Sequence, residues 1–119
     1  MKTYKHALII DDDTDLCLLL KVILNTSIPD VKLAHSIESG EKLLRYLRPD
    51  VIFLDNSLPD GQGLNYIKEI KSISPESRLI IITANDNTRD EAMLNGADFF
   101  LDKPLTPAKI QEALNLVHK

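Results

Sequence analysis

Acidic side chains gather directly behind the first apolar segment of the sequence. The run Ala7–Ile10 is followed by Asp11, Asp12, Asp13 and Asp15. Two carboxylates about 4 Å apart repel each other by on the order of 4 kcal/mol at an effective dielectric constant of roughly 20. If these side chains share one site in the fold, a positive charge must lie among them.

Apolar runs of strand length alternate with helical patterns along the chain, which is typical of βα units. Continuous runs at Ala7–Ile10, Val51–Leu54 and Leu79–Ile82 are expected to be central parallel strands, because helices cover both faces of such a sheet. The alternating segment Val31–Ala34 and the short segment Phe99–Leu101 fit the edges of the sheet. The sequence therefore predicts five strands.

Five helices fit between and after these strands, which completes a (βα)₅ pattern. Each is delimited by residues that favour a helix start or stop: a Ser or Thr cap, a proline, or a glycine. Asp13 and Asp15 are explained better by the start of the first helix than by metal binding. The expected helices run from a cap at Thr14 to about Thr26, from about Ser39 to before Pro49, from about Gly63 to Ser72, from a capping box at Thr88–Glu91 to Gly96, and onward from Thr106–Pro107.

Polar side chains follow four of the five expected strands. In an open parallel sheet, ligands bind beyond the carboxyl ends of the strands, at one edge. Asp11 and Asp12 follow the first strand, Asp55 the third, Thr83 the fourth and Lys103 the fifth. Lys103 and a hard divalent cation can offset the repulsion among the acids, and oxygen ligands favour Mg²⁺, or Mn²⁺, over zinc.

Length and composition indicate one domain and limit the classes of partner. The chain has 119 residues, 44% of them apolar, and a formal net charge of −4. Direct binding of nucleic acid is not expected, because it needs a clustered basic face. The apolar runs are too short for a membrane span and the start lacks a secretory signal pattern, so we expect a cytoplasmic protein. The single cysteine, Cys17, agrees with a reducing compartment and is expected to be a small apolar helix residue.

Four segments together resemble the receiver domain of two-component response regulators. They lie in order on the expected strand ends: IIDDD (Ile9–Asp13), DVIFLDNSLPDGQGL (Asp50–Leu64), IITA (Ile81–Ala84) and GADFFLDKPL (Gly96–Leu105). The resemblance covers essentially the whole chain. It implies an α/β fold with an open five-stranded parallel sheet in the order 2-1-3-4-5, doubly wound and flavodoxin-like. It also makes residues 1–119 a single receiver domain, with no output domain in this chain.

The resemblance implies a site, position by position. Asp55 matches the phospho-acceptor, which receives a phosphoryl group from a sensor histidine kinase or a histidine phosphotransfer protein. Asp12 and Asp55 match direct Mg²⁺ ligands, the backbone carbonyl of Ser57 matches a further ligand, and Asp11 matches a ligand that acts through water. Lys103 matches the lysine that pairs with Asp55. The chain is thereby expected to catalyse only its own phosphorylation and dephosphorylation, and not to be an enzyme for other substrates.

The resemblance also implies a switch. Thr83 matches the hydroxyl residue that moves toward the phosphoryl group, Phe100 matches the aromatic that rotates behind it, and Lys103–Pro104 matches a peptide bond that is cis in the family. Ser57 and Asn85 lie where the family tunes the rate of dephosphorylation. The switched surface consists of the fourth helix, the fifth strand and the fifth helix. It acts on an output domain or protein target and is a candidate surface for a homodimer.

Other interpretations stay open on the sequence alone. A phosphatase of the haloacid-dehalogenase type would use Asp11 as nucleophile, but the last position of its D-x-D-x-[TV] motif is Asp15 here. A purely structural pseudo-receiver would bind no Mg²⁺. Phe100 fits packing at the sheet edge as well as a switch, and Leu18 fits either docking of the kinase or packing against a neighbouring helix. The histidines show no ligand spacing and are expected at the surface: His6, His35 and His118.

Overall fold

Five strands form one parallel sheet in the computed structural model, which describes residues 4–84 and 86–117. Their order across the sheet is β2-β1-β3-β6-β7, so β6 and β7 are the fourth and fifth strands of the prediction. The order 2-1-3-4-5 is confirmed. The strands are β1 (His6–Ile10), β2 (Asp30–Ala34), β3 (Val51–Asp55), β6 (Arg78–Thr83) and β7 (Phe99–Asp102).

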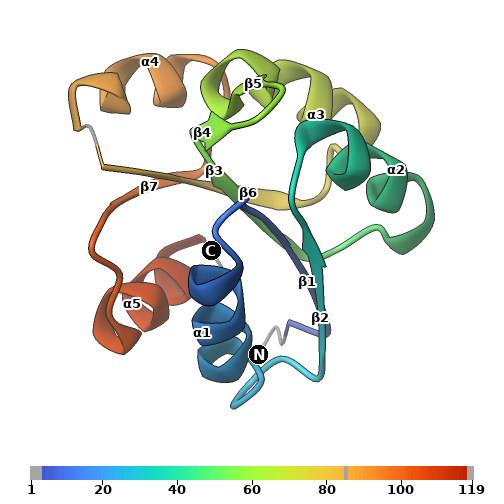
Figure 1. Ribbon diagram of the computed structural model, residues 1–119, viewed down its shortest axis with the longest axis vertical. Helices are drawn as coiled ribbons and strands as arrows, with labels where there is room; N and C mark the ends of the chain where they lie inside the picture. Colours follow the sequence, from blue (N-terminus) through green and yellow to red (C-terminus); the bar gives the residue numbers. More distant parts are fainter. Residues whose placement is uncertain (1–3, 85, 118–119) are drawn as a thin grey trace.

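Helices cover both faces of the sheet. Helices α1 and α5 lie on one face, and α2, α3 and α4 lie on the other (Figure 1). This arrangement confirms the doubly wound α/β fold, and it follows from right-handed crossovers between parallel strands. The helices are α1 (Thr14–Leu24), α2 (Ile37–Leu47), α3 (Ile67–Ile73), α4 (Arg89–Leu94) and α5 (Pro107–Val117).

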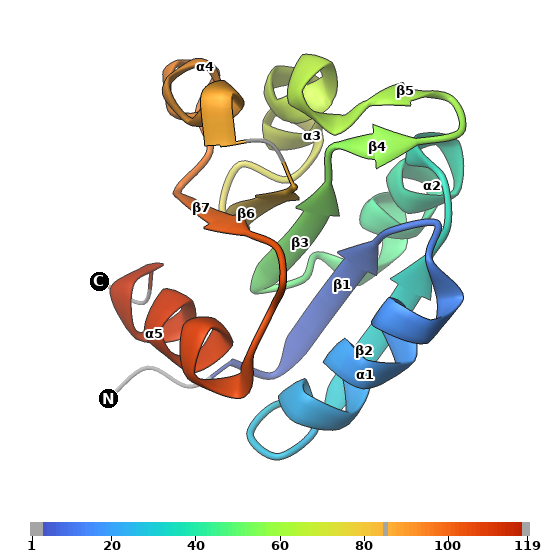
Figure 2. The same cartoon turned by 60° about the vertical axis from the view of Figure 1, so that its left-hand side comes forward.

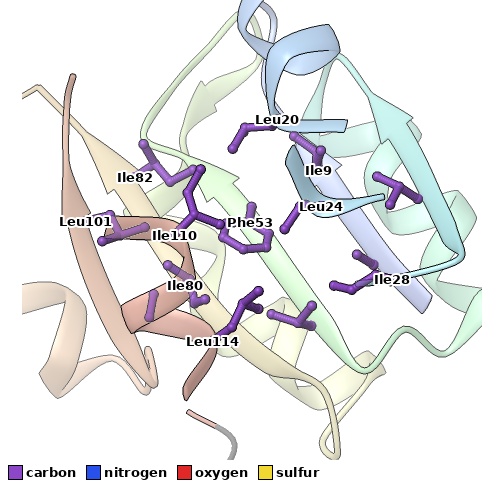
Figure 3. Packing of buried hydrophobic residues seen from close by; sticks show 14 of the residues in the cluster. Ile9, Leu20, Leu24, Ile28, Phe53, Ile80, Ile82, Leu101, Ile110 and Leu114 are labelled. Atoms are coloured by element: carbon purple, nitrogen blue, oxygen red, sulfur yellow. The ribbon is translucent and has the colours of Figure 1, made fainter. Parts of the chain in front are cut away.

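The central strands separate two apolar layers. On the face of α1 and α5, the ring of Phe53 packs among Ile9, Leu20 and Ile110 (Figure 3). Leu54, the next residue along β3, belongs instead to the layer under α2, α3 and α4. Because successive side chains of a strand point to opposite faces, a strand between two layers must be apolar at every position. The continuous apolar runs in the sequence therefore indicate strands that are buried on both faces.

The first two helices begin at other residues than predicted. Asp13, not Thr14, caps α1, because its Oδ1 accepts a hydrogen bond of 3.1 Å from the amide of Leu16. Asp and Thr are both preferred at the N-cap position, so the sequence alone does not show which of Asp13 and Thr14 caps the helix. Helix α1 also ends earlier, at Leu24 rather than Thr26. Helix α2 begins at Ile37 rather than Ser39, because Ser36 forms the capping box in which Ser39 is the second member.

Between β3 and α3 the chain forms a small hairpin rather than a plain loop. Strands β4 (Ser57–Leu58) and β5 (Gly61–Gln62) pair antiparallel. A 3₁₀ turn, η1 (Gly63–Tyr66), then precedes α3, so the predicted single helix from Gly63 is divided in two. The hairpin follows the end of β3 directly and lies at the carboxyl edge of the sheet (Figure 2).

The ends of α4 only partly match the prediction. Thr88 occupies the cap position at the end of the short turn η2 (Asp86–Thr88), with φ −92° and ψ 0°, and its side chain does not cap the helix. A capping side chain needs an extended backbone, which this turn does not provide. The stop at Gly96 is confirmed: φ is +110°, and the amides of Gly96 and Ala97 donate to the carbonyls of Met93 and Ala92.

Helix α5 begins as the sequence predicts. The Oγ1 of Thr106 accepts a hydrogen bond of 3.1 Å from the amide of Lys109, and Pro107 is the first helical residue. Within the described residues, no helix has the combination of length and apolar character that crossing a membrane requires.

Candidate functional site

Three carboxylates converge at the carboxyl edge of the sheet. Strands β1 and β3 are neighbours with Ile10 opposite Leu54, so the residues that follow them lie side by side. One carboxylate oxygen from each of Asp11, Asp12 and Asp55 lies within 4.8 Å of the others. The convergence predicted from the strand ends is therefore present in the structure.

Lys103 supplies the positive charge of the site. Its Nζ lies 2.9 Å from Asp55 Oδ1 and 3.9 Å from Asp11 Oδ2. The amide of Lys103 donates to the carbonyl of Thr83 at 3.0 Å, which turns the chain back over the sheet edge, and the Lys103–Pro104 bond is cis as expected. Burial lowers the pKa of the lysine, but the hydrogen bond to Asp55 and the nearby acids raise it above its ordinary value.

Asp11 lies buried beneath the rim, with 1% of its surface exposed. Its Oδ1 accepts a hydrogen bond of 2.9 Å from the amide of Asp13, whereas its Oδ2 has no hydrogen-bond partner among the described residues. Burial raises the pKa of Asp11 to about 6, and the charge of Asp55 adds to this effect. This buried oxygen accepts no hydrogen bond, has the Lys103 ammonium only at 3.9 Å and lies beside two further carboxylates, which fits a divalent cation with oxygen ligands.

Asp55 is also buried, with 2% of its surface exposed, but both of its oxygens have partners. Oδ1 pairs with Lys103, and Oδ2 accepts a hydrogen bond of 3.0 Å from the amide of Ser57. This bond brings the backbone of Ser57 against the carboxylate. Asp12, in contrast, is exposed on the rim. The site thus combines two buried acids with one that faces solvent.

Asn56 and Gly63 support the end of β3, and sequence reasoning did not assign them a role. The carbonyl and the Oδ1 of Asn56 accept hydrogen bonds of 2.9 Å from the amides of Gly63 and Leu64. A Cβ at Gly63 would lie 2.3 Å from the backbone oxygen of Asp55, so only glycine allows this close approach. Neither contact has a local sequence signal, because each joins the strand end to a segment beyond the hairpin.

Asp60, at the tip of the hairpin, was also missed. Its two carboxylate oxygens each accept a hydrogen bond of 3.0 Å, from the amides of Ile37 and Glu38 in the first turn of α2. These bonds lower the pKa of Asp60. The hairpin that follows Asp55 is therefore attached to the start of α2, and the two bonded residues, Ile37 and Asp60, are 23 positions apart in sequence. The P-D-G pattern indicates a turn but not this contact.

Thr83 and Phe100 lie on the face of the sheet that α2, α3 and α4 cover. Thr83 ends β6 one residue beyond Ile82, the partner of Asp55, and is buried. Phe100 lies opposite Ile81, is 5% exposed and belongs to the same apolar layer. The guanidinium of Arg89 on α4 lies 5.6 Å from the centre of the Phe100 ring. Asn85 and His118 lie outside the described residues.

A cavity of about 340 Å³ opens beside the Phe100 strand, between α4 and α5. Its lining mixes apolar and charged side chains from α4, β7 and α5. The lining residues are Arg89, Phe99, Phe100, Leu101, Asp102, Lys109 and Glu112. This cavity lies on the surface for which the sequence predicts contact with an output partner.

Helix α1 carries exposed apolar side chains next to the site. Leu18 is 57% exposed and Val22 is 68% exposed. The alternative that Leu18 packs closely against a neighbouring helix is therefore wrong, while docking of a kinase stays a prediction. Cys17 is buried, and burial together with nearby acids raises its pKa to about 12, so its thiol is not reactive, as expected.

Comparisons with known proteins agree with this geometry. A family model described as "Response regulator receiver domain" matches residues 7–115. The chain is 34% identical over 119 residues to "Chemotaxis protein CheY" of Thermotoga maritima, covering 97% of this chain and 98% of that protein.

Solved structures show the same fold. A two-component response regulator from Clostridium difficile aligns with a TM-score of 0.88 and 28% identity over 97% of each chain. A response regulator from Burkholderia pseudomallei, described with a phosphorylated aspartic acid, a calcium ion and citrate, aligns with a TM-score of 0.84 and 27% identity. That alignment covers 96% of this chain and 69% of the other. On the fold, the converging acids with their lysine and the matched family model, this chain belongs to the response regulator receiver domain family.

Proposed function

We propose that the chain is a cytoplasmic signalling module that accepts a phosphoryl group on Asp55 from a phosphohistidine and passes the change to its α4–β7–α5 surface. The observation that carries the proposal is the 2.9 Å ion pair between Lys103 Nζ and the buried Asp55 Oδ1, beside two further carboxylates. An acid held in this way is an oxygen nucleophile with a fixed cation beside it.

The residues that would hold Mg²⁺, or Mn²⁺, are Asp12, Asp55 and the Ser57 carbonyl, with Asp11 acting through water. Two observations support this assignment: Asp11 Oδ2 accepts no hydrogen bond from the described residues, and oxygen ligands cluster around it. When bound, the cation supplies positive charge opposite the oxygens of the transferring phosphoryl group. The relative from Burkholderia pseudomallei, with its phosphorylated aspartic acid and calcium ion, agrees with this chemistry.

The proposed transfer is a displacement at phosphorus. A carboxylate oxygen of Asp55 forms the new P–O bond while the P–N bond to the donor imidazole breaks and its electron pair returns to the ring nitrogen. Lys103, already paired with Asp55, offsets the negative charge on the phosphoryl oxygens. The product is an acyl phosphate on Asp55. The chain acts on its own residue and is not a general phosphatase.

The response would then pass along the face that carries Thr83 and Phe100. The Thr83 hydroxyl donates a hydrogen bond to the new phosphoryl group, and Phe100 adjusts in the layer behind it. The burial of both side chains on one face supports this route. Arg89 over the Phe100 ring links the route to α4. The partner is a sensor histidine kinase or histidine phosphotransfer protein on the input side and an output domain or protein target on the other.

Chemical phosphorylation tests the proposal directly. The full chain is incubated with acetyl phosphate and Mg²⁺, and the modified residue is located by borohydride reduction and peptide mass spectrometry. The expected result is one phosphoryl group on Asp55. It should be absent in Asp55→Ala and present in the control Asp15→Asn, which changes an exposed acid in the first turn of α1. Label on Asp11 with turnover of phosphoesters would instead support the haloacid-dehalogenase alternative. Absence of Mg²⁺ binding and of any response to beryllofluoride would make the chain a structural pseudo-receiver.

A further inference from the structure

The backbone carbonyl of Asp11 accepts hydrogen bonds from two side chains that the proposed chemistry does not use. His35 Nδ1 lies 2.9 Å from this oxygen, and Cys17 Sγ lies 3.2 Å from it. A carbonyl oxygen only accepts, so Nδ1 must carry the hydrogen, and neutral His35 then has its acceptor nitrogen at Nε2. The thiol of Cys17 is the second donor, because it remains protonated at neutral pH.

These contacts attach the start of the acidic loop to the end of β2. The amide of Asp11 donates to the carbonyl of Ala34 at 3.0 Å, and the adjacent residue His35 donates to the carbonyl of Asp11. Both backbone polar groups of Asp11 are thus held by two consecutive residues. Because the peptide unit is planar, the direction of this carbonyl also sets the amide and the Cα of Asp12.

Asp12 depends on this support more than the other two acids do. Among the described residues, no hydrogen bond or ion pair holds its carboxylate, whereas Asp11 and Asp55 each accept a backbone amide. Its side chain is exposed and is free to turn. The place of the Asp12 carboxylate over the site therefore rests on the orientation of the Asp11–Asp12 peptide.

We propose that His35 is a positioning residue for the divalent cation site: its Nδ1–H, together with the Cys17 thiol, holds the Asp11–Asp12 peptide and thereby sets the affinity for Mg²⁺. This inference rests on the proposed function, because it takes the three acids as the cation site. Hydrogen bonds behind metal ligands are worth about 10–100-fold in metal affinity when they are removed. His35 acts through the backbone and shares the carbonyl with Cys17, so the effect is expected at the lower end of this range.

Two variants of His35 distinguish a role of its hydrogen bond in positioning the Asp11–Asp12 peptide from a role of its side chain in packing. His35→Ala removes the donor. His35→Asn retains one, because the amide nitrogen of asparagine takes nearly the place of the imidazole Nδ1. His6→Ala is the matched control: His6 is also exposed and hydrogen-bonded, to Asp30 at 2.8 Å, but it lies at the amino end of β1, away from the acids.

Each variant of the 119-residue chain is titrated with Mg²⁺, and binding is followed by the amide chemical shifts of the acidic loop. For His35→Ala we expect the dissociation constant to rise about tenfold, with recovery in His35→Asn and no change in His6→Ala. The thermal stability gained on adding Mg²⁺ gives a second readout, because a loss of packing would lower the melting temperature equally with and without the cation.

The inference is overturned if His35→Ala binds Mg²⁺ as the unmodified chain does, or if His35→Asn is as weak as His35→Ala. If His35→Ala does not fold, His35→Asn and Cys17→Ala carry the test, and unchanged affinity in Cys17→Ala together with weak binding in a folded His35→Asn contradicts the proposed hydrogen bond. Failure of the unmodified chain to bind Mg²⁺ would overturn the proposed function itself and this inference with it. The same titration distinguishes this outcome from a failure of the inference alone, in which the unmodified chain still binds Mg²⁺.

Discussion

Lys103 Nζ lies 2.9 Å from Asp55 Oδ1, although Asp55 ends β3, Lys103 follows β7, and β6 lies between these two strands. The lysine reaches over the end of the intervening strand. This is possible because the chain after β7 turns back, with the Lys103 amide bound to the carbonyl of Thr83. The pair therefore depends on three strands ending at the same edge.

Replacing Lys103 with alanine is expected to slow phosphorylation of Asp55 by acetyl phosphate about a hundredfold, because one fixed charge opposite the phosphoryl oxygens is lost. Affinity for Mg²⁺ is expected to rise, since a competing cation has gone. Rates come from the time course of phosphoprotein formation. Lys42→Ala, which breaks an exposed ion pair with Glu38 at 3.3 Å on α2, is the control. Equal rates in the two variants would contradict the assigned role.

The effect of Asp11→Asn on the free energy of unfolding should have opposite signs without and with Mg²⁺. Without Mg²⁺, the substitution removes a buried charge one of whose oxygens accepts no hydrogen bond, and we expect the free energy of unfolding to rise by roughly 1–3 kcal/mol. With saturating Mg²⁺, the unmodified chain should gain more stability than the variant, which binds the cation more weakly. Urea unfolding with Mg²⁺ or with a chelator measures both. A variant that is less stable in the chelator would show that the charge is already compensated.

A partly buried acid away from the site, Glu41, should make the free energy of unfolding depend on pH. Glu41 on α2 has an unpartnered Oε2, and burial, together with a hydrogen bond to Glu69 and its charge, raises its pKa to about 7. An acid whose pKa is higher in the folded state binds its proton more tightly there. Stability is therefore lost as the pH rises from the ordinary value of 4.5 through about 7.

Glu41→Gln is expected to remove this loss and to be more stable than the unmodified chain by on the order of 1–2 kcal/mol around pH 8, with little gain around pH 5. Chemical unfolding across this range measures it. Asp11 titrates in the same window, so the informative quantity is the difference between variant and unmodified chain at each pH. Glu38→Gln, an exposed acid of the same helix paired with Lys42 at 3.3 Å, should show no such difference.

Asp60→Ala should lower the free energy of unfolding by about 1 kcal/mol, as loss of a helix cap does, and should also weaken Mg²⁺ binding by freeing the hairpin that begins with Ser57. Because its pKa is lowered in the folded state, the contribution of Asp60 is present at neutral pH and is lost as the pH falls below about 4. Asp60→Asn, which keeps one acceptor oxygen, should lie between. If stability falls but Mg²⁺ affinity stays the same, the hairpin does not depend on this attachment.

Leu18→Lys is expected to slow phosphotransfer from the cognate kinase while leaving labelling by acetyl phosphate unchanged, because only the protein donor needs the exposed face of α1. The two rates are measured on the same preparation. Tyr46→Lys on α2, where the side chain is 82% exposed, controls for charge at an apolar surface position. Equal slowing with both donors would point to a defect in the site instead of in docking.

The sequence predicts the framework of the site because its signals are local. Apolar runs identify the strands, and the parallel arrangement then brings Asp11, Asp55 and Lys103 to one edge without further information. The start of α1 is less certain, since Asp13 and Thr14 are both capping residues. The distant supports have no local signal at all. The residues joined by the Asp60–Ile37 hydrogen bond are 23 positions apart in sequence, and those joined by the His35–Asp11 hydrogen bond are 24 apart. No sequence motif or periodic pattern indicates either contact.

The reach of Lys103 over β6 also makes the site depend on the docking of one edge strand, β7. Asp11 and Asp12 follow β1 and Asp55 ends β3, but Lys103 follows β7, which lies at the edge of the described sheet next to β6. During synthesis on the ribosome the acids emerge long before the lysine does, and the complete site exists only after β7 has docked. Local detachment of this edge strand would take Lys103 away from Asp11 and Asp55 while the rest of the sheet remains folded.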